Sequence, residues 1–198
     1  MPRFIDLIFA AFGLLLGAPL WLAIALTVKF SSPGPVLFSQ ERIGRHGHIF
    51  QILKFRTMRL DPTGELYLRT LGDRDPRVTK VGRFLRRTKL DEIPQLFNVL
   101  RGEMSLVGPR PEVPKFVSLQ DALQLEVLSV RPGLTDPASI VFRNESSLLE
   151  KALDPERYYR EKILPRKLAL SRSYINQRSP RRDVGVIAKT LQKAVFRG

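Results

Sequence analysis

Two adjacent carboxylates, Asp91 and Glu92, are the residues of this chain that best fit a chemical reaction. Arg86, Arg87 and Lys89 stand just before them, so the pair lies among positive charges. Adjacent helical residues point about 100° apart, so one acid could attack or bind a metal while the other binds a metal or moves a proton. The basic neighbours are expected to keep Asp91 ionised and nucleophilic. This arrangement suits chemistry on a phosphorylated substrate.

The same residues also fit a structural interpretation, in which the acids begin a helix. The spacing from Thr88 to Asp91 matches a capping box, and acids in a first turn interact favourably with the helix dipole. Pro94 is also tolerated in a first turn. From these residues alone capping is the more frequent outcome, and the basic surroundings are what favour a catalytic role.

Four further basic residues could bind the oxygens of a phosphate group. Lys54 and Arg56 would share one face of a strand, although a solvated strand face explains that spacing equally well. Arg110 lies between two prolines, and Arg131 precedes a Pro-Gly pair. Because proline restricts the backbone, each guanidinium would be presented from a stiff loop, which suits bidentate binding of phosphate.

An apolar segment near the N-terminus, residues 7–28, contains no charged residue. It is long enough to cross a bilayer, which takes about 20 helical residues, and longer than the apolar part of a signal peptide, about 7–15 residues. Pro19 predicts a kink or break within it. Arg3 precedes the segment and Lys29 follows it, so charge indicates no single orientation. A kinked spanning helix and a helix that bends and leaves on the same side both remain open.

The rest of the chain is predicted to form helices around one β-hairpin. The hairpin consists of residues 36–43 and 48–56 around a glycine-bounded turn, and residues 59–77 are expected to form a mobile loop or short helix. Helices are expected from about residue 79, over 91–100, over 115–130 and over 154–176 with an interruption near Pro165. A basic amphipathic helix ends the chain, and its apolar stripe is Val184, Ile187, Ala188, Leu191 and Val195.

The composition indicates a polyanionic partner. The chain has 198 residues, a net charge of +14 and no cysteine, which excludes disulfides and thiolate metal sites. Its two histidines make a histidine-rich metal site improbable. Nucleic acid would suit the charge, but the chain has no zinc-finger spacing or aromatic RNA-binding strand. An apolar segment beside spread-out positive charge favours a membrane surface instead.

The sequence resembles the bacterial sugar transferases, also called monotopic polyprenyl-phosphate phosphoglycosyl transferases. Four blocks carry the resemblance, namely residues 34–44, 54–58, 90–100 and 102–111, and residues 131–135 fit it too. Matching C-terminal positions are Pro165, Lys167, Leu168, Tyr174, Ser179, Asp183 and Thr190. The length is similar to that of the minimal members, which lack an extra N-terminal membrane domain.

The resemblance implies a mainly α-helical, monotopic membrane protein with a small β-hairpin and amphipathic interfacial helices. Residues 1–30 would form a re-entrant helix broken at Pro19. The resemblance therefore favours the helix that bends and leaves on the same side over the kinked spanning helix. Residues 31–198 would form one catalytic domain that faces the cytoplasm at the bacterial inner membrane. The implied partners are a UDP-sugar, undecaprenyl phosphate and membrane lipids, with no nucleic acid, and a homodimer is compatible with the resemblance.

The implied reaction moves a phosphosugar from the UDP-sugar to undecaprenyl phosphate and releases UMP, in two Mg²⁺-dependent steps. Asp91 would attack the β-phosphate to form an aspartyl-phosphosugar, and Glu92 would assist through Mg²⁺ or proton transfer, so both acids are assigned to the metal. The substrate phosphates are assigned to Arg86, Arg110, Arg131, Lys54 and Arg56, and the nucleotide to Asp183.

One block departs from the family pattern. Many members have glycine, an aromatic residue and Ala-Gln after the threonine of the Arg-Pro-Gly block, whereas this chain has residues 136–139, Asp-Pro-Ala-Ser. The departure bears on the sugar that is bound and not on the reaction. Two competing hypotheses are a non-catalytic, membrane-anchored protein that recruits anionic partners, and a nucleic-acid binder held at the membrane, whose affinity would fall steeply with salt.

Overall fold

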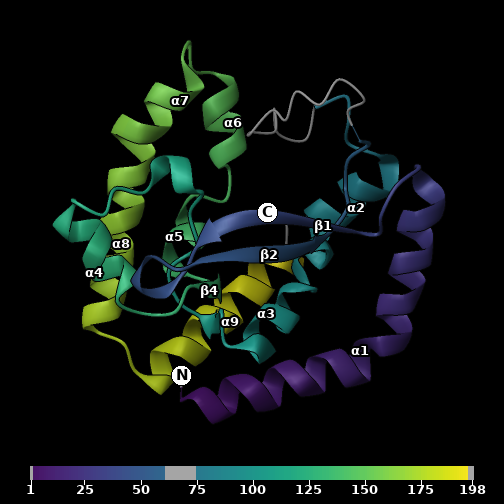
Figure 1. The fold of residues 1–198 in the computed structure, drawn as a ribbon, viewed down its shortest axis with the longest axis horizontal. Coiled ribbons are helices and arrows are strands. Elements are labelled where there is room, and N and C mark those ends of the chain that lie inside the picture. Colours follow the sequence, from purple (N-terminus) through teal and green to yellow (C-terminus); the bar gives the residue numbers. More distant parts are fainter. Residues whose placement is uncertain (1, 61–74, 196–198) are drawn as a thin grey trace.

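The computed structural model describes residues 2–60 and 75–195. Helices surround an antiparallel hairpin formed by β1 (Leu37–Ile43) and β2 (Ile49–Phe55). In Figure 1 the hairpin crosses the middle of the molecule, and α1 (Arg3–Ser31) runs along its lower and right-hand sides. The long helix α8 (Leu164–Asn176) stands on the opposite, left-hand side. The expected helical fold with one small hairpin is therefore confirmed.

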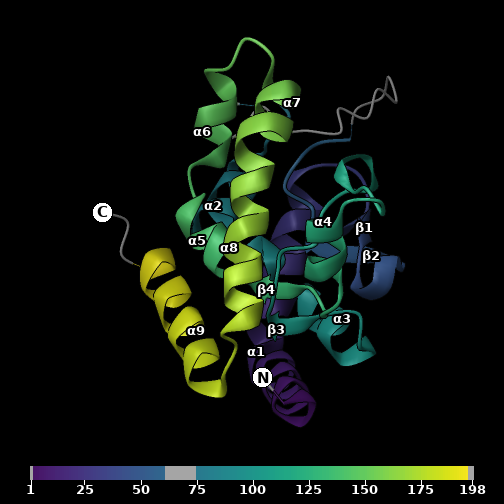
Figure 2. The ribbon, with the colours of Figure 1, turned by 90° about the vertical axis from the view of Figure 1, so that its left-hand side faces the viewer.

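Most of the other elements are short and helical, and the last of them is longer, with 16 residues. They are η1 (Arg45–Gly47), α2 (Lys80–Thr88), η3 (Leu90–Glu92), α3 (Gln95–Arg101), β3 (Ser105–Val107), η4 (Pro114–Phe116), α4 (Ala122–Leu128), β4 (Gly133–Thr135), α5 (Pro137–Val141), α6 (Glu145–Glu150), α7 (Pro155–Tyr158), the π-helical η5 (Tyr159–Ile163) and α9 (Pro180–Val195). Figure 2 shows α9 at the edge of the molecule, beside α8.

Several boundaries differ from the sequence prediction. The helix expected over 115–130 is the short turn η4 followed by α4, whose N-terminus is capped by Asp121. The predicted interruption near Pro165 is confirmed, because the π-helical η5 ends just before it. The parallel pairing of β3 with β4 was not predicted, since each strand has three residues and too short a pattern to recognise. The expected loop over 59–77 lies largely outside the described residues.

Both ends of α1 attach to the rest of the protein. At its start, the Asp6 carboxylate accepts hydrogen bonds from the Ser105 hydroxyl at 2.8 Å and the Leu106 amide at 3.2 Å. At its end, the buried Arg56 guanidinium donates to the carbonyls of Ser32 at 2.7 Å and Pro33 at 2.5 Å. The helix is long and apolar enough to cross a membrane by length and composition, and both of its ends make hydrogen bonds to later parts of the chain.

The middle of α1 is bent, as Figure 1 shows where the helix changes direction. Pro19 lies inside the helix and removes a backbone hydrogen bond there. The Trp21 indole lies against Gly17, where an added Cβ would come within 2.1 Å of the ring. The same indole donates a hydrogen bond to the Gly13 carbonyl at 3.1 Å. The predicted kink is therefore accompanied by a side chain that folds back along the helix.

The segment that carries Asp91 and Glu92 is held against the hairpin. Helix α2 ends at Thr88, and the next residue, Lys89, has a left-handed φ of 62° that turns the chain into η3. The next helix, α3, is attached to β2 by Asn98, which accepts from the Leu53 amide and donates to the Gln51 carbonyl. The turn and this attachment place the two acids beside the β2 strand.

The capping interpretation of the acids is wrong. Asp91 and Glu92 lie in η3, before α3 begins, and neither side chain caps a helix. The Thr88 hydroxyl donates back to the carbonyls of Phe84 and Leu85, so it is at a helix C-terminus. A capping role is therefore not the reason for two adjacent acids at this position.

Gly82 determines how closely α2 approaches the end of the hairpin. An added Cβ would lie 1.9 Å from the Thr57 carbonyl oxygen and 2.7 Å from its Cα. Because both atoms belong to the backbone, the clash cannot be relieved by a rotamer change. We expect Gly82→Ala to lower the free energy of unfolding by about 3 kcal/mol, measured by denaturant unfolding in detergent.

Gly185 provides the matched control. It also lies inside a helix, α9, but an added Cβ would meet nothing within 4 Å. Gly185→Ala should therefore raise stability by about 0.5–1 kcal/mol, because alanine loses less backbone entropy on folding. If the two substitutions changed the free energy of unfolding equally, the close approach of α2 to Thr57 would not require glycine at position 82.

Candidate active site

Asp91 and Glu92 are buried, with exposed fractions of 7% and 8%. Burying two adjacent carboxylates is costly unless cations or hydrogen bonds compensate for the lost hydration. Lys54 of β2 and Arg110 of the loop after β3 supply that compensation from two distant parts of the chain. The site is therefore assembled by the hairpin, η3 and the Arg110 loop.

Glu92 binds both cations directly. Its Oε1 accepts from Lys54 Nζ at 2.9 Å and from Arg110 Nη2 at 2.5 Å, and its Oε2 accepts from Arg110 Nη1 at 3.3 Å. Burial opposes the ionisation of Glu92, but Arg110 and Lys54 outweigh it and hold the pKa of Glu92 well below its usual value. Glu92 is thus an ionised anchor that orients the two cations.

Asp91 has a different environment. Burial, together with the charge of Glu92, raises the pKa of Asp91, although Lys54, Lys89 and Arg86 oppose the shift. The basic neighbours thus counteract the rise in the pKa of Asp91 without cancelling it. Its buried Oδ1 atom has no hydrogen-bond partner among the described residues. Two adjacent acids thus differ in kind, one saturated by cations and one available for a ligand.

Burial lowers the pKa of Lys54, and Glu92 only partly offsets this. In contrast, the charge of Glu92 raises the pKa of Arg110 above its usual value. Arg86 lies in the last turn of α2, where its Nε donates to the Thr57 hydroxyl at 2.9 Å. The structure therefore gathers Lys54, Arg86 and Arg110 near the acids, as the sequence predicted.

Arg110 is fixed by its backbone as well as by its side chain. The buried Asp136 carboxylate accepts from the Arg110 amide at 2.7 Å and from the Ser139 amide at 2.5 Å, and so caps α5. Burial raises the pKa of Asp136, which these two hydrogen bonds partly counteract. The Asp-Pro pair that departs from the family pattern is therefore the support of the Arg110 loop.

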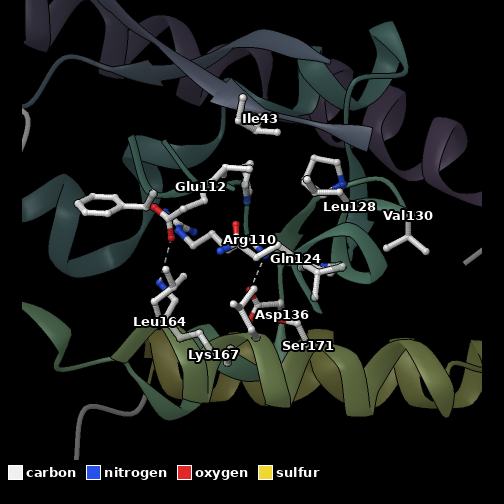
Figure 3. A pocket seen from close by; sticks show the side chains of 18 of the residues that line it. Ile43, Arg110, Glu112, Gln124, Leu128, Val130, Asp136, Leu164, Lys167 and Ser171 are labelled. Carbon is white, nitrogen blue, oxygen red and sulfur yellow. Dashed lines mark hydrogen bonds and ion pairs between the residues drawn. The ribbon is translucent and has the colours of Figure 1, made fainter. Parts of the chain in front are cut away.

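A largely apolar pocket lies beside this loop. Figure 3 shows Arg110 in its middle, with Ile43 of β1 on one side and Leu164, Lys167 and Ser171 of α8 on the other. On the α8 side, Glu112 accepts a hydrogen bond from the Tyr159 hydroxyl, which in turn accepts from Lys167. The pocket thus separates the acid pair from α8.

Three predicted site residues lie elsewhere. The Arg56 guanidinium donates hydrogen bonds to backbone carbonyls at the end of α1, and the residue is 4% exposed, so these contacts are structural. Asp183 is fully buried and accepts a hydrogen bond from the Tyr174 hydroxyl, which joins α9 to α8. Arg131 donates to the Gly102 carbonyl at 2.9 Å, at the far end of α3 from the acids. No described contact joins these residues to the acid pair.

Gln95 is a site residue that sequence reasoning missed. It is fully buried, and neither its Oε1 nor its Nε2 has a hydrogen-bond partner among the described residues. Its position four residues after Asp91 was the available signal, because such residues share a helix face. The Gln95 amide and the Asp91 Oδ1 atom are both buried without a partner among the described residues, so each is a candidate contact for a ligand.

Replacing Gln95 separates function from stability. Gln95→Leu removes a buried amide that has no partner among the described residues, so we expect the free energy of unfolding to stay equal or to rise by about 1–2 kcal/mol. Catalytic turnover should nevertheless fall at least about tenfold, because the ligand loses a polar contact. Denaturant unfolding and steady-state kinetics measure the two effects.

Asn98→Leu is the matched control, because that amide is equally buried but fully hydrogen bonded. It should lower stability by more than about 2 kcal/mol. If Gln95→Leu destabilised the protein as much as Asn98→Leu, Gln95 would have a structural partner and no ligand role.

Of the two acids, Asp91 has the carboxylate oxygen that could bind a divalent cation. Among residues 2–60 and 75–195 no cluster of three His, Cys, Asp or Glu could hold a metal unaided. Magnesium, however, is commonly held by one or two carboxylates together with substrate phosphates and water. The free, buried oxygens of Asp91 and Gln95 provide such a partial site, whereas the Glu92 oxygens already bind cations.

Curated relatives align with most of this chain. A protein of Komagataeibacter xylinus named "Undecaprenyl-phosphate glucose phosphotransferase" is 40% identical over 98% of this chain and 36% of its own length. A protein of Bacillus subtilis named "Putative undecaprenyl-phosphate N-acetylgalactosaminyl 1-phosphate transferase" is 43% identical over 68% of this chain and 71% of its own length.

The third relative comes from Escherichia coli and is named "UDP-glucose:undecaprenyl-phosphate glucose-1-phosphate transferase". It is 44% identical over 76% of this chain and 33% of its own length. The chain therefore spans about a third of the length of two of these relatives. The family model described as "Bacterial sugar transferase" matches residues 1–197. This chain, with its buried acid pair and paired cations, therefore belongs to the bacterial sugar transferase family.

Proposed function

We propose that the chain transfers a phosphosugar from a UDP-sugar to undecaprenyl phosphate. One observation carries the proposal, namely a buried Asp91 with an unpartnered oxygen beside an ionised Glu92 that holds two cations. The names of the relatives describe transfer of sugar phosphates to undecaprenyl phosphate and supply the substrate class. Family membership covers nearly the whole chain.

The reaction balances as two displacements at one phosphorus. In the first, an Asp91 oxygen attacks the β-phosphorus of the UDP-sugar, and the bond from that phosphorus to the bridging oxygen breaks. UMP leaves with the bond's electron pair, and an aspartyl-phosphosugar remains. In the second, an oxygen of undecaprenyl phosphate attacks the same phosphorus, releases the Asp91 carboxylate and forms undecaprenyl-diphosphate-sugar.

The cations around Glu92 could reduce the charge repulsion between the Asp91 carboxylate and the diphosphate, which is the main physical obstacle to this route. A carboxylate that approaches a diphosphate is repelled by its negative charge, so the phosphates must be neutralised first. Arg110 and Lys54 form ion pairs with Glu92, and Arg86 adds a third positive charge near Asp91. Because the pKa of Glu92 is low, we assign it to positioning these cations and not to proton transfer.

Magnesium is the proposed cofactor. Asp91 and Gln95 would hold it, with Glu92 nearby, and the bound ion would neutralise phosphate oxygens as a Lewis acid. The protein residues then have three tasks, since Asp91 attacks, Arg110 binds phosphate oxygens, and Glu92 keeps Arg110 in place.

The proposed membrane arrangement follows from α1. We propose that residues 1–30 enter the bilayer, bend at Pro19 and leave on the side of entry, while residues 31–198 form the catalytic domain on the cytoplasmic face of the inner membrane. Attachment of both helix ends to the same domain supports this. Val184 and Leu191 of α9 are exposed and would lie at the lipid interface. A homodimer remains an untested prediction.

The deciding experiment is a panel of UDP-sugars mixed with the full chain, undecaprenyl phosphate and Mg²⁺ in detergent. We expect UMP release from one or two sugars, and formation of a lipid diphosphate-sugar in equal amount. In the absence of the lipid acceptor, UMP should still appear in an amount up to that of the enzyme. A chain that merely recruits anionic partners would release none, and this result would overturn the proposal.

A further inference from the structure

A second basic cavity lies away from the acid pair. Its volume is about 220 Å³, and its lining includes Arg3, Arg45, Arg131 and Arg178. These arginines come from four separate places, namely α1, η1, the loop before β4 and the loop between α8 and α9. The fold therefore brings together four like charges that are far apart in sequence.

Each of these guanidinium groups is held in place by the backbone. Arg3 donates to the carbonyls of Val99 and Met104, and Arg131 donates to that of Gly102. The Nε of Arg45 donates to Ser129 at 3.0 Å, and Nη2 of Arg178 donates to Val107 at 3.4 Å. Fixed guanidinium groups lose little side-chain entropy when they bind an anion.

The cavity has too little negative charge of its own. Asp6 is the single acid in its lining, and the Asp6 carboxylate already accepts from Ser105 and Leu106. Arg178 is paired with Asp183 at 3.8 Å outside the lining, so Arg3, Arg45 and Arg131 share the cavity with one committed carboxylate. Gathering like charges is unfavourable unless an anion joins them. Arg3 and Arg131 help to cap α3, Arg45 donates to the C-cap residue of α4, and Arg178 pairs with Asp183. None of these contacts places a free negative charge in the cavity lining.

The position of the cavity identifies the kind of anion. Arg3 begins α1, and the next turns of this helix expose Phe4 and Ile8 by 62% and 60%. Large apolar side chains at that exposure fit contact with lipid, so the cavity lies where headgroups would be. The acid pair precedes α3 and Gly102 follows it, so the length of α3, about 10 Å, separates the two sites.

We propose that this cavity binds the phosphate group of an anionic membrane phospholipid. Planar guanidinium groups bind phosphate oxygens in pairs, which suits a phosphodiester headgroup. A free phosphate ion offers the same chemistry, so the test must distinguish the two sources. Such a site would orient the protein on the bilayer through the start of α1, independently of the sugar that it transfers.

The test measures binding by the full chain in micelles of a nonionic detergent. Native mass spectrometry follows titration with short-chain phosphatidylglycerol, short-chain phosphatidylcholine and inorganic phosphate, each alone. Wild-type protein should bind phosphatidylglycerol at least about tenfold more tightly than either of the others. Inorganic phosphate binding as tightly as phosphatidylglycerol would overturn the lipid assignment, and equal binding of the two lipids would overturn the site.

Matched variants locate the binding. The double variant Arg45→Gln/Arg131→Gln should lose at least about tenfold in affinity for phosphatidylglycerol. Arg83→Gln/Arg87→Gln removes the same charge from the exposed face of α2 and should bind as wild type does. An equal loss in both variants would mean that only overall charge matters. Arg45 is exposed, so the single variant Arg45→Gln should show a smaller loss even if the double variant folds poorly.

Discussion

Asp91→Asn should abolish phosphosugar transfer, with a fall in turnover of at least about a thousandfold. The substitution keeps the size of the side chain but removes the nucleophilic oxygen. UMP release without the lipid acceptor should also disappear, because that release reports the first displacement alone. Mass spectrometry of wild-type protein incubated with the UDP-sugar should find a phosphosugar on the peptide that contains Asp91.

Asp154→Asn is the control for this substitution. Asp154 is exposed and caps α7, so the same chemical change should leave turnover within about twofold of wild type. If Asp91→Asn retained full turnover, or if the adduct formed on another residue, Asp91 would not be the nucleophile.

The same carboxylate should set the acid limb of the pH profile. Attack requires ionised Asp91, and burial together with Glu92 raises its pKa above the ordinary 3.8. Activity is therefore lost as pH falls through this raised pKa, while Glu92, whose pKa is low, stays ionised. Lys54 opposes the shift of Asp91, so Lys54→Met should move the limb of kcat/KM to still higher pH. If Lys54→Met left the acid limb of kcat/KM at the same pH, the limb would belong to the titration of another group.

The sequence was most informative where a pattern is long or a residue is chemically unusual. The hairpin alternates over seven residues in each strand, and the apolar N-terminal helix is longer still, so both were predictable. Asp91, Glu92, Lys54 and Arg110 could be gathered because the family resemblance groups them. The different roles of the two acids could not be predicted. They depend on Lys54 and Arg110, which are distant in sequence and bind Glu92 only in the folded structure.

Two of the predicted phosphate ligands have structural contacts that the sequence did not indicate. Arg56 and Arg131 each donate to backbone carbonyls that an adjacent helix end leaves unpaired. A guanidinium group serves either purpose, and only the three-dimensional path of the chain decides between them. Gln95 was overlooked for the opposite reason, since a neutral amide attracts no attention until its burial is known.

Arg110 carries the second large expected effect. Arg110→Gln should lower kcat/KM for the UDP-sugar by about a hundredfold to a thousandfold, because a positioned cation on the transferring phosphate is lost. It should also lower the free energy of unfolding by about 3 kcal/mol, because Glu92 keeps its buried charge without the partner that binds both of its oxygens. Arg110→Lys should recover only part of either quantity, since an ammonium group cannot bind the carboxylate as a fork.

Combining Arg110→Gln with Glu92→Gln separates the catalytic role of Arg110 from its structural one. The double variant removes both charges of the Arg110–Glu92 ion pair, so part of the lost stability should return, although Lys54 then lacks its carboxylate partner. Activity should not return, because the phosphate still lacks its cation. Unfolding in denaturant and the kinetics of UMP release give the two readings on the same preparations. Recovery of both together would mean that Arg110 only maintains the fold around Asp91, and that the phosphate is held by other residues.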